Sequence, residues 1–127
     1  MADQPERSDQ AFKTAWFSKA ARNALIDDEE LCKAIRQVML GQPDDLGGGV
    51  FKKRLDKNRS RSIILERVGH YWVYEFLFAK KDRANITYGE LAKFRDLAKS
   101  YRVLTEQRIN EFTRDEVWME ICNGTET

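Results

Sequence analysis

Cysteine and histidine are scarce in this sequence, which limits the scaffolds and sites that it can form. The 127 residues include two cysteines, Cys32 and Cys122, and one histidine, His70. The cysteines lie far apart and form no C-x-x-C motif, so we expect two free thiols in a reducing cytosol, with no disulfide or zinc site. With one histidine and no carboxylates at ligand spacing, no metal or other cofactor is expected.

Long apolar segments are absent as well. No apolar run approaches the roughly 18 residues that cross a membrane, and the opening MADQPERSDQ lacks the apolar part of a signal peptide. We therefore expect a cytoplasmic protein with no membrane partner. Residues 1–10 are predicted to be a flexible lead, and residues 11–127 a single domain, because 127 residues is about one domain's length.

Positive charge is concentrated in the middle of the chain. Residues 50–83 hold ten Lys or Arg and four acids, a balance of +6, although the whole chain carries only +1. The other residues hold twelve bases and seventeen acids, a balance of −5. This pattern favours a localised anion site over a generally basic surface. A solvated pair of strands is the alternative interpretation.

Helical spacing of apolar residues predicts two helices at the start of the domain. The first is expected from Ala11. Asp27 is a good N-cap for the second, with Glu30 three residues later, and Gly41 ends it. The pair should form a helical hairpin. The DDLGGGV segment that follows, residues 44–50, is expected to be an irregular loop.

Strand-like segments come next. Residues 50–55, 62–68 and 71–78 are rich in β-branched and aromatic residues, and Gly69-His70 between the last two reads as a hairpin turn. Three strands with short links predict an antiparallel meander. The aromatic residues of 71–78 are interpreted as core, with a base-stacking platform as the alternative.

The last part of the chain predicts a third helix and a tail. Thr87 and Glu90 form a T-x-x-E capping box, a short helix is expected over residues 105–112, and residues 117–122 read as a last strand or extended clasp. The order of these elements indicates one α+β domain.

The basic residues fall where the predicted strands could bring them together. Strand side chains alternate between faces, so Lys52 and Arg54 should point the same way, whereas Lys53 shares the parity of the apolar Phe51 and Leu55. In a meander, the other candidates would converge at one end of the sheet. They are Lys57, Arg59 and Arg61 before and at the start of the second strand, and Lys80, Lys81 and Arg83 after the third.

Such a cluster suits an RNA phosphodiester. Arg and Lys can hold the phosphate and stabilise the charge of a pentacoordinate transition state. RNA supplies its own nucleophile, the 2′-OH, so the protein needs to add only a base and an acid. A lysine can be the base where neighbouring cations favour its neutral form. His70 and Tyr88 are possible proton carriers, although a solvated turn residue and a capping or packing residue are the plainer interpretations.

Several segments resemble the RelE-like toxins of bacterial toxin–antitoxin systems, in the branch grouped with the HigB toxins. They are DLGGGVFKKRL at 45–55, RSIIL at 61–65 and YWVYEFLFAKKDRANI at 71–86, and the likeness extends from about Phe12 to Cys122. The resemblance implies a small twisted antiparallel sheet of three to four strands, an N-terminal helical hairpin and helices packed on one face. It also implies metal-free cleavage of mRNA in the ribosomal A site through the 2′-OH, leaving a 2′,3′-cyclic phosphate.

The resemblance assigns the family's catalytic positions to five residues. They are Lys52, Arg54, Arg61, Lys81 and, offset by about one position, Tyr88. The bases Lys53, Lys57, Arg59, Lys80 and Arg83 are then expected to bind RNA. The implied partners are mRNA, the ribosome and an antitoxin, often a helix-turn-helix protein.

This sequence departs from the family pattern at two points. The link before Arg61 is the short DKNRS, with no Tyr directly before the arginine, and Arg54 stands where the family has a lysine. Arginine is effectively always protonated, so the role of base moves to Lys52 or Lys53. Two alternatives therefore stay open: a ParE-like toxin that poisons DNA gyrase, and a degenerate relative that binds RNA or its antitoxin without cleavage.

Overall fold

The computed structural model describes residues 9–41, 44–67 and 71–122. In these residues six strands and four helices follow one another. They are β1 (Gln10–Thr14), α1 (Ala15–Asn23), α2 (Asp28–Met39), β2 (Asp44–Gly47), β3 (Val50–Leu55), β4 (Ser60–Arg67), β5 (Tyr71–Ala79), α3 (Tyr88–Tyr101), α4 (Glu106–Arg114) and β6 (Trp118–Ile121). The expected Gly69-His70 turn lies outside the described residues, as do residues 1–8 of the expected lead.

All six strands form one sheet, in the order β2-β3-β4-β5-β1-β6. β3, β4 and β5 pair antiparallel as the predicted meander, and β1 joins β5 in parallel. β6 pairs antiparallel with the far side of β1. The expectation of an antiparallel sheet with three to four strands is therefore wrong: the fold is α+β, but the sheet is mixed and larger.

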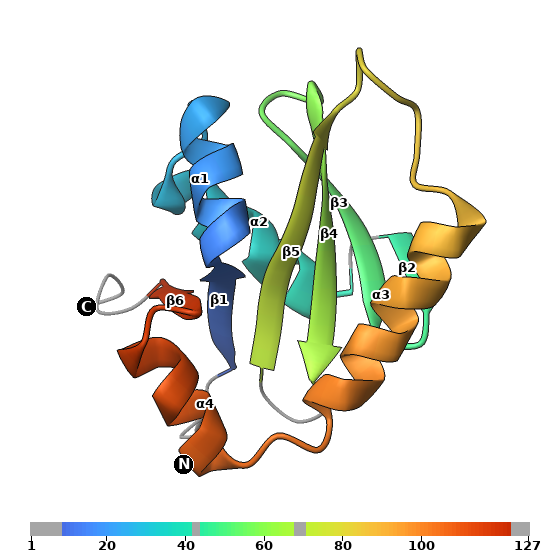
Figure 1. Cartoon of the computed structure of the whole chain (residues 1–127). Helices are drawn as coiled ribbons and strands as arrows, with labels where there is room; N and C mark the ends of the chain where they lie inside the picture. Colours follow the sequence, from blue (N-terminus) through green and yellow to red (C-terminus); the bar gives the residue numbers. More distant parts are fainter. Residues whose placement is uncertain (1–8, 42–43, 68–70, 123–127) are drawn as a thin grey trace.

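Helices cover both faces of this sheet, so the expectation of helices on one face is also wrong. α1 and α2 bury Phe17, Leu31 and Ile35 against one face. α3 and α4 bury Tyr101 and Ile109 against the other. In Figure 1, α2 lies behind the sheet and α3 in front of it. We call these the α2 face and the α3 face.

Two segments have structures that the sequence did not predict. The segment expected to begin a helix at Ala11 instead forms β1, where Ala11 is buried on the α2 face and Phe12 on the α3 face. A strand buried on both faces lacks the alternating pattern that identifies half-exposed strands. Thr14 then caps α1 by accepting a hydrogen bond from Phe17 N. The glycine-rich segment expected to be a loop contains β2 and its turn into β3.

The predicted helix caps are confirmed. The Asp27 carboxylate accepts a hydrogen bond from Glu30 N at 2.9 Å. Both bonds of the Thr87–Glu90 capping box are present. Thr105 caps α4, close to the predicted short helix.

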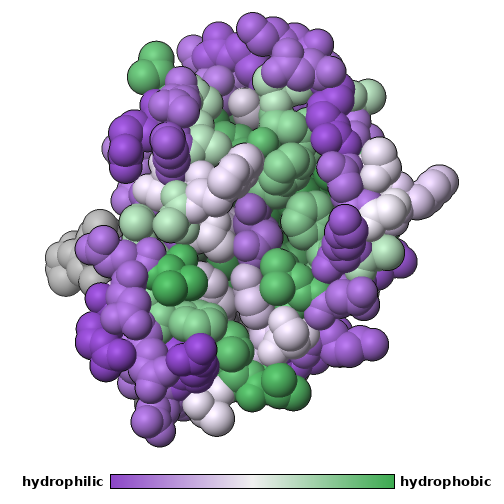
Figure 2. All heavy atoms as spheres, viewed as in Figure 1, coloured by the Kyte–Doolittle hydropathy of each residue, from purple (hydrophilic) through white to green (hydrophobic). Residues whose placement is uncertain are grey.

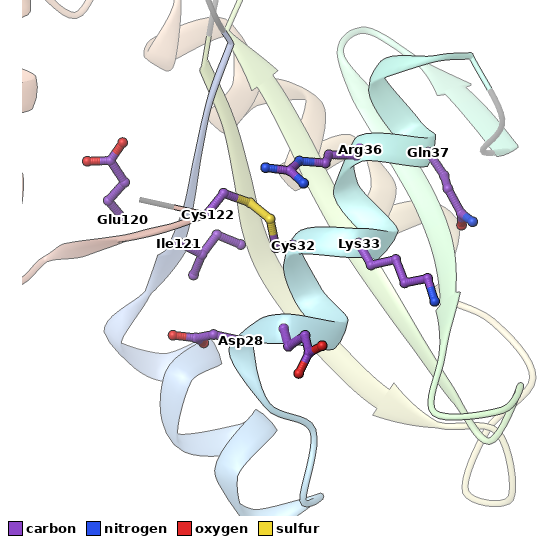
Figure 3. Close-up of a pocket in the computed structure, with 9 residues that line it drawn as sticks. Asp28, Cys32, Lys33, Arg36, Gln37, Glu120, Ile121 and Cys122 are labelled. Atoms are coloured by element: carbon purple, nitrogen blue, oxygen red, sulfur yellow. A yellow bond between two sulfur atoms is a disulfide. The ribbon is translucent and has the colours of Figure 1, made fainter. Parts of the chain in front are cut away.

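The two cysteines form a disulfide, so the expectation of free thiols is wrong. Cys32 in α2 and Cys122 just after β6 have Cα atoms 5.3 Å apart, within the range that a disulfide spans. The bond ties the end of β6 to α2, as Figure 3 shows. Spacing in the sequence could not reveal this, because the packing of α2 against the end of β6 brings together residues that are 90 positions apart. In the described part of the chain, no helix is both long and apolar enough to cross a membrane.

Candidate functional site

Three of the predicted site residues lie on the α3 face in two adjacent cross-strand rows. Lys52 pairs with Ile63, which pairs with Phe76 on β5. Two residues along, Arg54 pairs with Arg61, which pairs with Phe78. Ile63, Phe76 and Phe78 belong to the apolar cluster on the α3 face, so the side chains of both rows project there. We call Lys52, Arg54 and Arg61 the basic rows.

The basic rows keep positive charge near the surface. Arg54 is exposed, and Lys52 and Arg61 are half-buried. Arg61 donates hydrogen bonds to the backbone carbonyls of Asn58 and Ser60, at 3.0 and 3.3 Å, which hold its guanidinium over the β3–β4 turn. Within the described residues none of the three forms an ion pair with a carboxylate, so all three charges are available to an anion.

Further bases gather at the same end of the sheet. The β3–β4 turn lies beside the segment that follows β5, because Lys80 N donates to Arg59 O at 2.9 Å. Lys57, Lys80 and Lys81 are all exposed there. The meander therefore brings the predicted turn and post-strand bases together at the end of the sheet where Arg54 and Arg61 lie.

Two of the predicted bases already hold carboxylates. Arg59 forms an ion pair with Asp56 at 2.7 Å, and this hydrogen-bonded guanidinium lowers the pKa of Asp56. Arg83 binds Glu90 through both guanidinium Nη atoms and lowers the pKa of Glu90 to about 2. These pairs fasten the turn and the loop before α3, and they leave Arg59 and Arg83 less charge to offer a phosphate.

The structure places the remaining two predicted residues differently. Lys53 shares its face with Phe51 and Leu55, so it lies on the α2 face, away from the basic rows. Tyr88 is the first residue of α3 and is 92% exposed. The Arg83–Glu90 pair ties the first turn of α3 to the basic segment after β5.

Glu75 is a feature of this face that the sequence interpretation missed. A β-bulge leaves it unpaired between Phe76, opposite Ile63, and Tyr74, opposite Ile64. The Tyr101 hydroxyl donates a 2.5 Å hydrogen bond to its carboxylate. Burial raises the pKa of Glu75 to about 7, against the smaller opposite effect of that hydrogen bond. A carboxyl in an otherwise apolar strand was the only signal for it in the sequence.

An aromatic residue beside the rows was also missed. Trp16 on α1 is 53% exposed and stacks on Phe76, with ring centroids 5.3 Å apart. Figure 2, which has the view of Figure 1, shows apolar residues gathered in a band over β5 between α1 and α3.

A depression of about 890 Å³ lies elsewhere, between α2 and the end of β6. Figure 3 shows acidic and basic side chains around it, with Asp28 at the start of α2, Lys33 and Arg36 farther along this helix, and Glu120 on the opposite side. It contains none of the predicted site residues. Its mixed charges do not select an anion, so the basic rows remain the candidate site.

Comparison with protein families gives a match over most of the chain. No curated protein matches the chain. A family model described as the RelE toxin of the RelE / RelB toxin–antitoxin system matches residues 9–121, which extend from just before β1 to the last residue of β6. The match covers nearly all of the 127 residues. The chain therefore belongs to the RelE toxin family of toxin–antitoxin systems.

Proposed function

We propose that this toxin is an endoribonuclease that cleaves mRNA on the ribosome through the 2′-OH and so stops translation. The observation that carries the proposal is the pair of basic rows, where Lys52, Arg54 and Arg61 share one face without carboxylate partners among the described residues. A surface that only bound protein would not need three such cations at one end of the sheet. Binding a phosphodiester and stabilising its transition state does require them.

We propose one role for each of these side chains. Arg54 and Arg61 bind the scissile phosphate and stabilise the negative charge that develops on its oxygens. Lys52, the one of the two candidate lysines on this face, takes the proton of the 2′-OH as that oxygen attacks phosphorus. The P–O5′ bond breaks, and Tyr88 donates a proton to the leaving oxygen, with Lys81 adding positive charge nearby.

The family implies an antitoxin as partner, and we propose a helix-turn-helix protein. The proposed substrate adds mRNA and the ribosomal A site, and it places the toxin in the cytoplasm. Lys57, Lys80 and Lys81, which are exposed around the rows, would bind flanking phosphates and steer the toxin toward ribosomal RNA.

The proposal is tested with a variant that removes two charges of the basic rows, Lys52→Ala with Arg61→Ala. The matched control, Arg22→Ala with Lys99→Ala, removes two charges from exposed positions on α1 and α3. We expect the wild type and the control to stop growth and produce new mRNA 5′ ends in primer extension, and the row variant to do neither while remaining folded. Full toxicity of the row variant would show that the site is wrongly placed.

The same induction experiment separates the other classes of toxin. An early stop in protein synthesis is expected for an mRNA endoribonuclease. An early stop in DNA synthesis with DNA damage would instead identify a gyrase poison, and binding to ribosomes without new 5′ ends would identify a relative that does not cleave RNA.

A further inference from the structure

A large exposed aromatic ring lies on the face that carries the basic rows. Trp16 is in the first turn of α1, whose N-cap Thr14 accepts from Phe17 N at 3.0 Å. Phe17 enters the core on the α2 face, and Trp16, the preceding residue, turns instead to Phe76 on the α3 face. More than half of the Trp16 side chain, 53%, stays exposed.

The Trp16 ring continues into a line of aromatic contacts. Its plane lies 20° from that of Phe76. Phe76 in turn contacts Phe94 on α3 and Phe78 on β5, with centroids 5.8 and 6.0 Å apart. The Arg83 guanidinium lies over Phe78, 5.5 Å from its centroid. We call Trp16, Phe76, Phe78 and Phe94 the aromatic strip.

The strip adjoins the basic rows through the register of the sheet. Phe76 shares its row with Lys52, which lies across β4, and Phe78 shares its row with Arg61 on β4 and Arg54 on β3. Strands lie roughly 4.8 Å apart, so roughly 10 Å of sheet separates the Phe76 and Lys52 backbones. The long Lys52 side chain reaches across much of that distance. The separation therefore fits one nucleotide, with its phosphate on the basic rows and its base toward Trp16.

We propose that Trp16, supported by Phe76, stacks on a nucleobase of the single-stranded RNA whose phosphate binds the basic rows. This inference rests on the proposed function. Exposed aromatic rings beside a cationic groove are the combination by which proteins bind unpaired RNA, because every base has a flat π-face. The basic rows supply the positive charge that an RNA backbone requires, and the Glu75 carboxylate beside Phe76 already accepts a hydrogen bond from Tyr101. Only Trp16 of the strip is largely exposed, because Phe78 is 7% exposed and the other two rings are half-buried, so the strip fits a base or two better than a protein helix.

The protein offers a direct readout of this contact. Of its three tryptophans, Trp72 is 8% and Trp118 1% exposed, so quenching by an added ligand reports on Trp16. The probe is a short single-stranded oligoribonucleotide with 2′-O-methyl groups, which cannot be cleaved through the 2′-OH. An abasic oligonucleotide of the same length supplies the same phosphates without bases. Both are titrated into the full chain at low salt.

We expect the base-bearing oligonucleotide to quench the fluorescence and to bind more tightly than the abasic one. Trp16→Ala should weaken binding of the base-bearing probe by roughly 5- to 150-fold and leave the abasic probe unaffected. Trp16→Phe, which keeps a ring, should restore most of the affinity. Leu40→Ala, which removes an exposed apolar side chain (76%) from the end of α2, is the matched control and should bind like the wild type.

Equal affinity of Trp16→Ala and the wild type for the base-bearing probe would overturn the inference. So would a Trp16→Ala toxin that cleaves mRNA at the wild-type rate but is no longer neutralised by its antitoxin, since the strip would then be a protein interface. Failure of the proposed function gives a different result, because mRNA would then remain uncut by the wild-type toxin. Cleavage that depends on Lys52 and Arg61 but not on Trp16 would leave the function standing and remove only the stacking site.

Discussion

Replacing Glu75 with glutamine should make the protein more stable above neutral pH. Glu75 is half-buried at the β-bulge of β5, where its carboxylate accepts a hydrogen bond from Tyr101. Burial penalises the charged form and raises the pKa of Glu75 to about 7 from an ordinary value of 4.5. Glutamine has nearly the same shape and still offers an oxygen to the Tyr101 hydroxyl, but it carries no charge at any pH.

The magnitude follows from proton linkage. Between the two pKa values, 4.5 unfolded and about 7 folded, the folded protein holds a proton that the unfolded chain has lost. The free energy of unfolding therefore falls by about 1.4 kcal/mol for each pH unit in this window. The protonated Glu75 carboxyl contributes its full stability to the folded protein below the pKa of the unfolded chain. This contribution is lost as the pH rises through the pKa of the folded protein. Across the whole window the free energy of unfolding falls by roughly 3 kcal/mol. This is an upper bound, because solvent reaches part of the Glu75 side chain.

Urea unfolding of the wild type and Glu75→Gln at about pH 5 and about pH 8 measures this effect. We expect similar stabilities at the acidic pH and a more stable variant, by up to roughly 3 kcal/mol, at the alkaline pH. Glu116→Gln, at an exposed carboxylate, is the control and should follow the wild type at both values. Parallel profiles for the wild type and Glu75→Gln would refute the reasoning.

Three further predictions concern stability and can be measured by the same unfolding assay. Reducing the Cys32–Cys122 disulfide should cost about 2–4 kcal/mol, and Cys122→Ser should no longer respond to the reductant. Gly48→Ala should cost about 1–2 kcal/mol, because Gly48 has φ +68° and its Cβ would lie 2.9 Å from Arg95 Cγ. Thr87→Ala removes the N-cap of α3 and should cost about 1 kcal/mol.

Local patterns predicted the meander and the caps because their causes are local. The segment 50–55 matches β3 residue for residue, and its alternation placed Lys52 and Arg54 on one face as observed. The capping box of Thr87 depends on residues within one helical turn. Such features need no knowledge of the tertiary structure.

The errors share a different cause, which is contact between distant parts of the chain. β1 lies between β5 and β6 with both faces covered, so its sequence shows no alternation. Cys32 and Cys122 meet only because α2 packs beside the end of β6. Trp16 stacks on Phe76, which is far away in the sequence. None of these contacts has a signature within a few residues.

The charge that a ligand meets differs from the charge counted along the sequence. Residues 50–83 carry +6, but Arg59 and Arg83 are held by carboxylates that fasten the β3–β4 turn and the loop before α3. The carboxylates of Asp56 and Glu90 thus hold the end of the sheet together. Lys52, Arg54 and Arg61 lie on that scaffold without such partners among the described residues, so the positive potential there is concentrated on the α3 face. RNA binding should therefore weaken steeply with salt when these three are present and less steeply as each is removed.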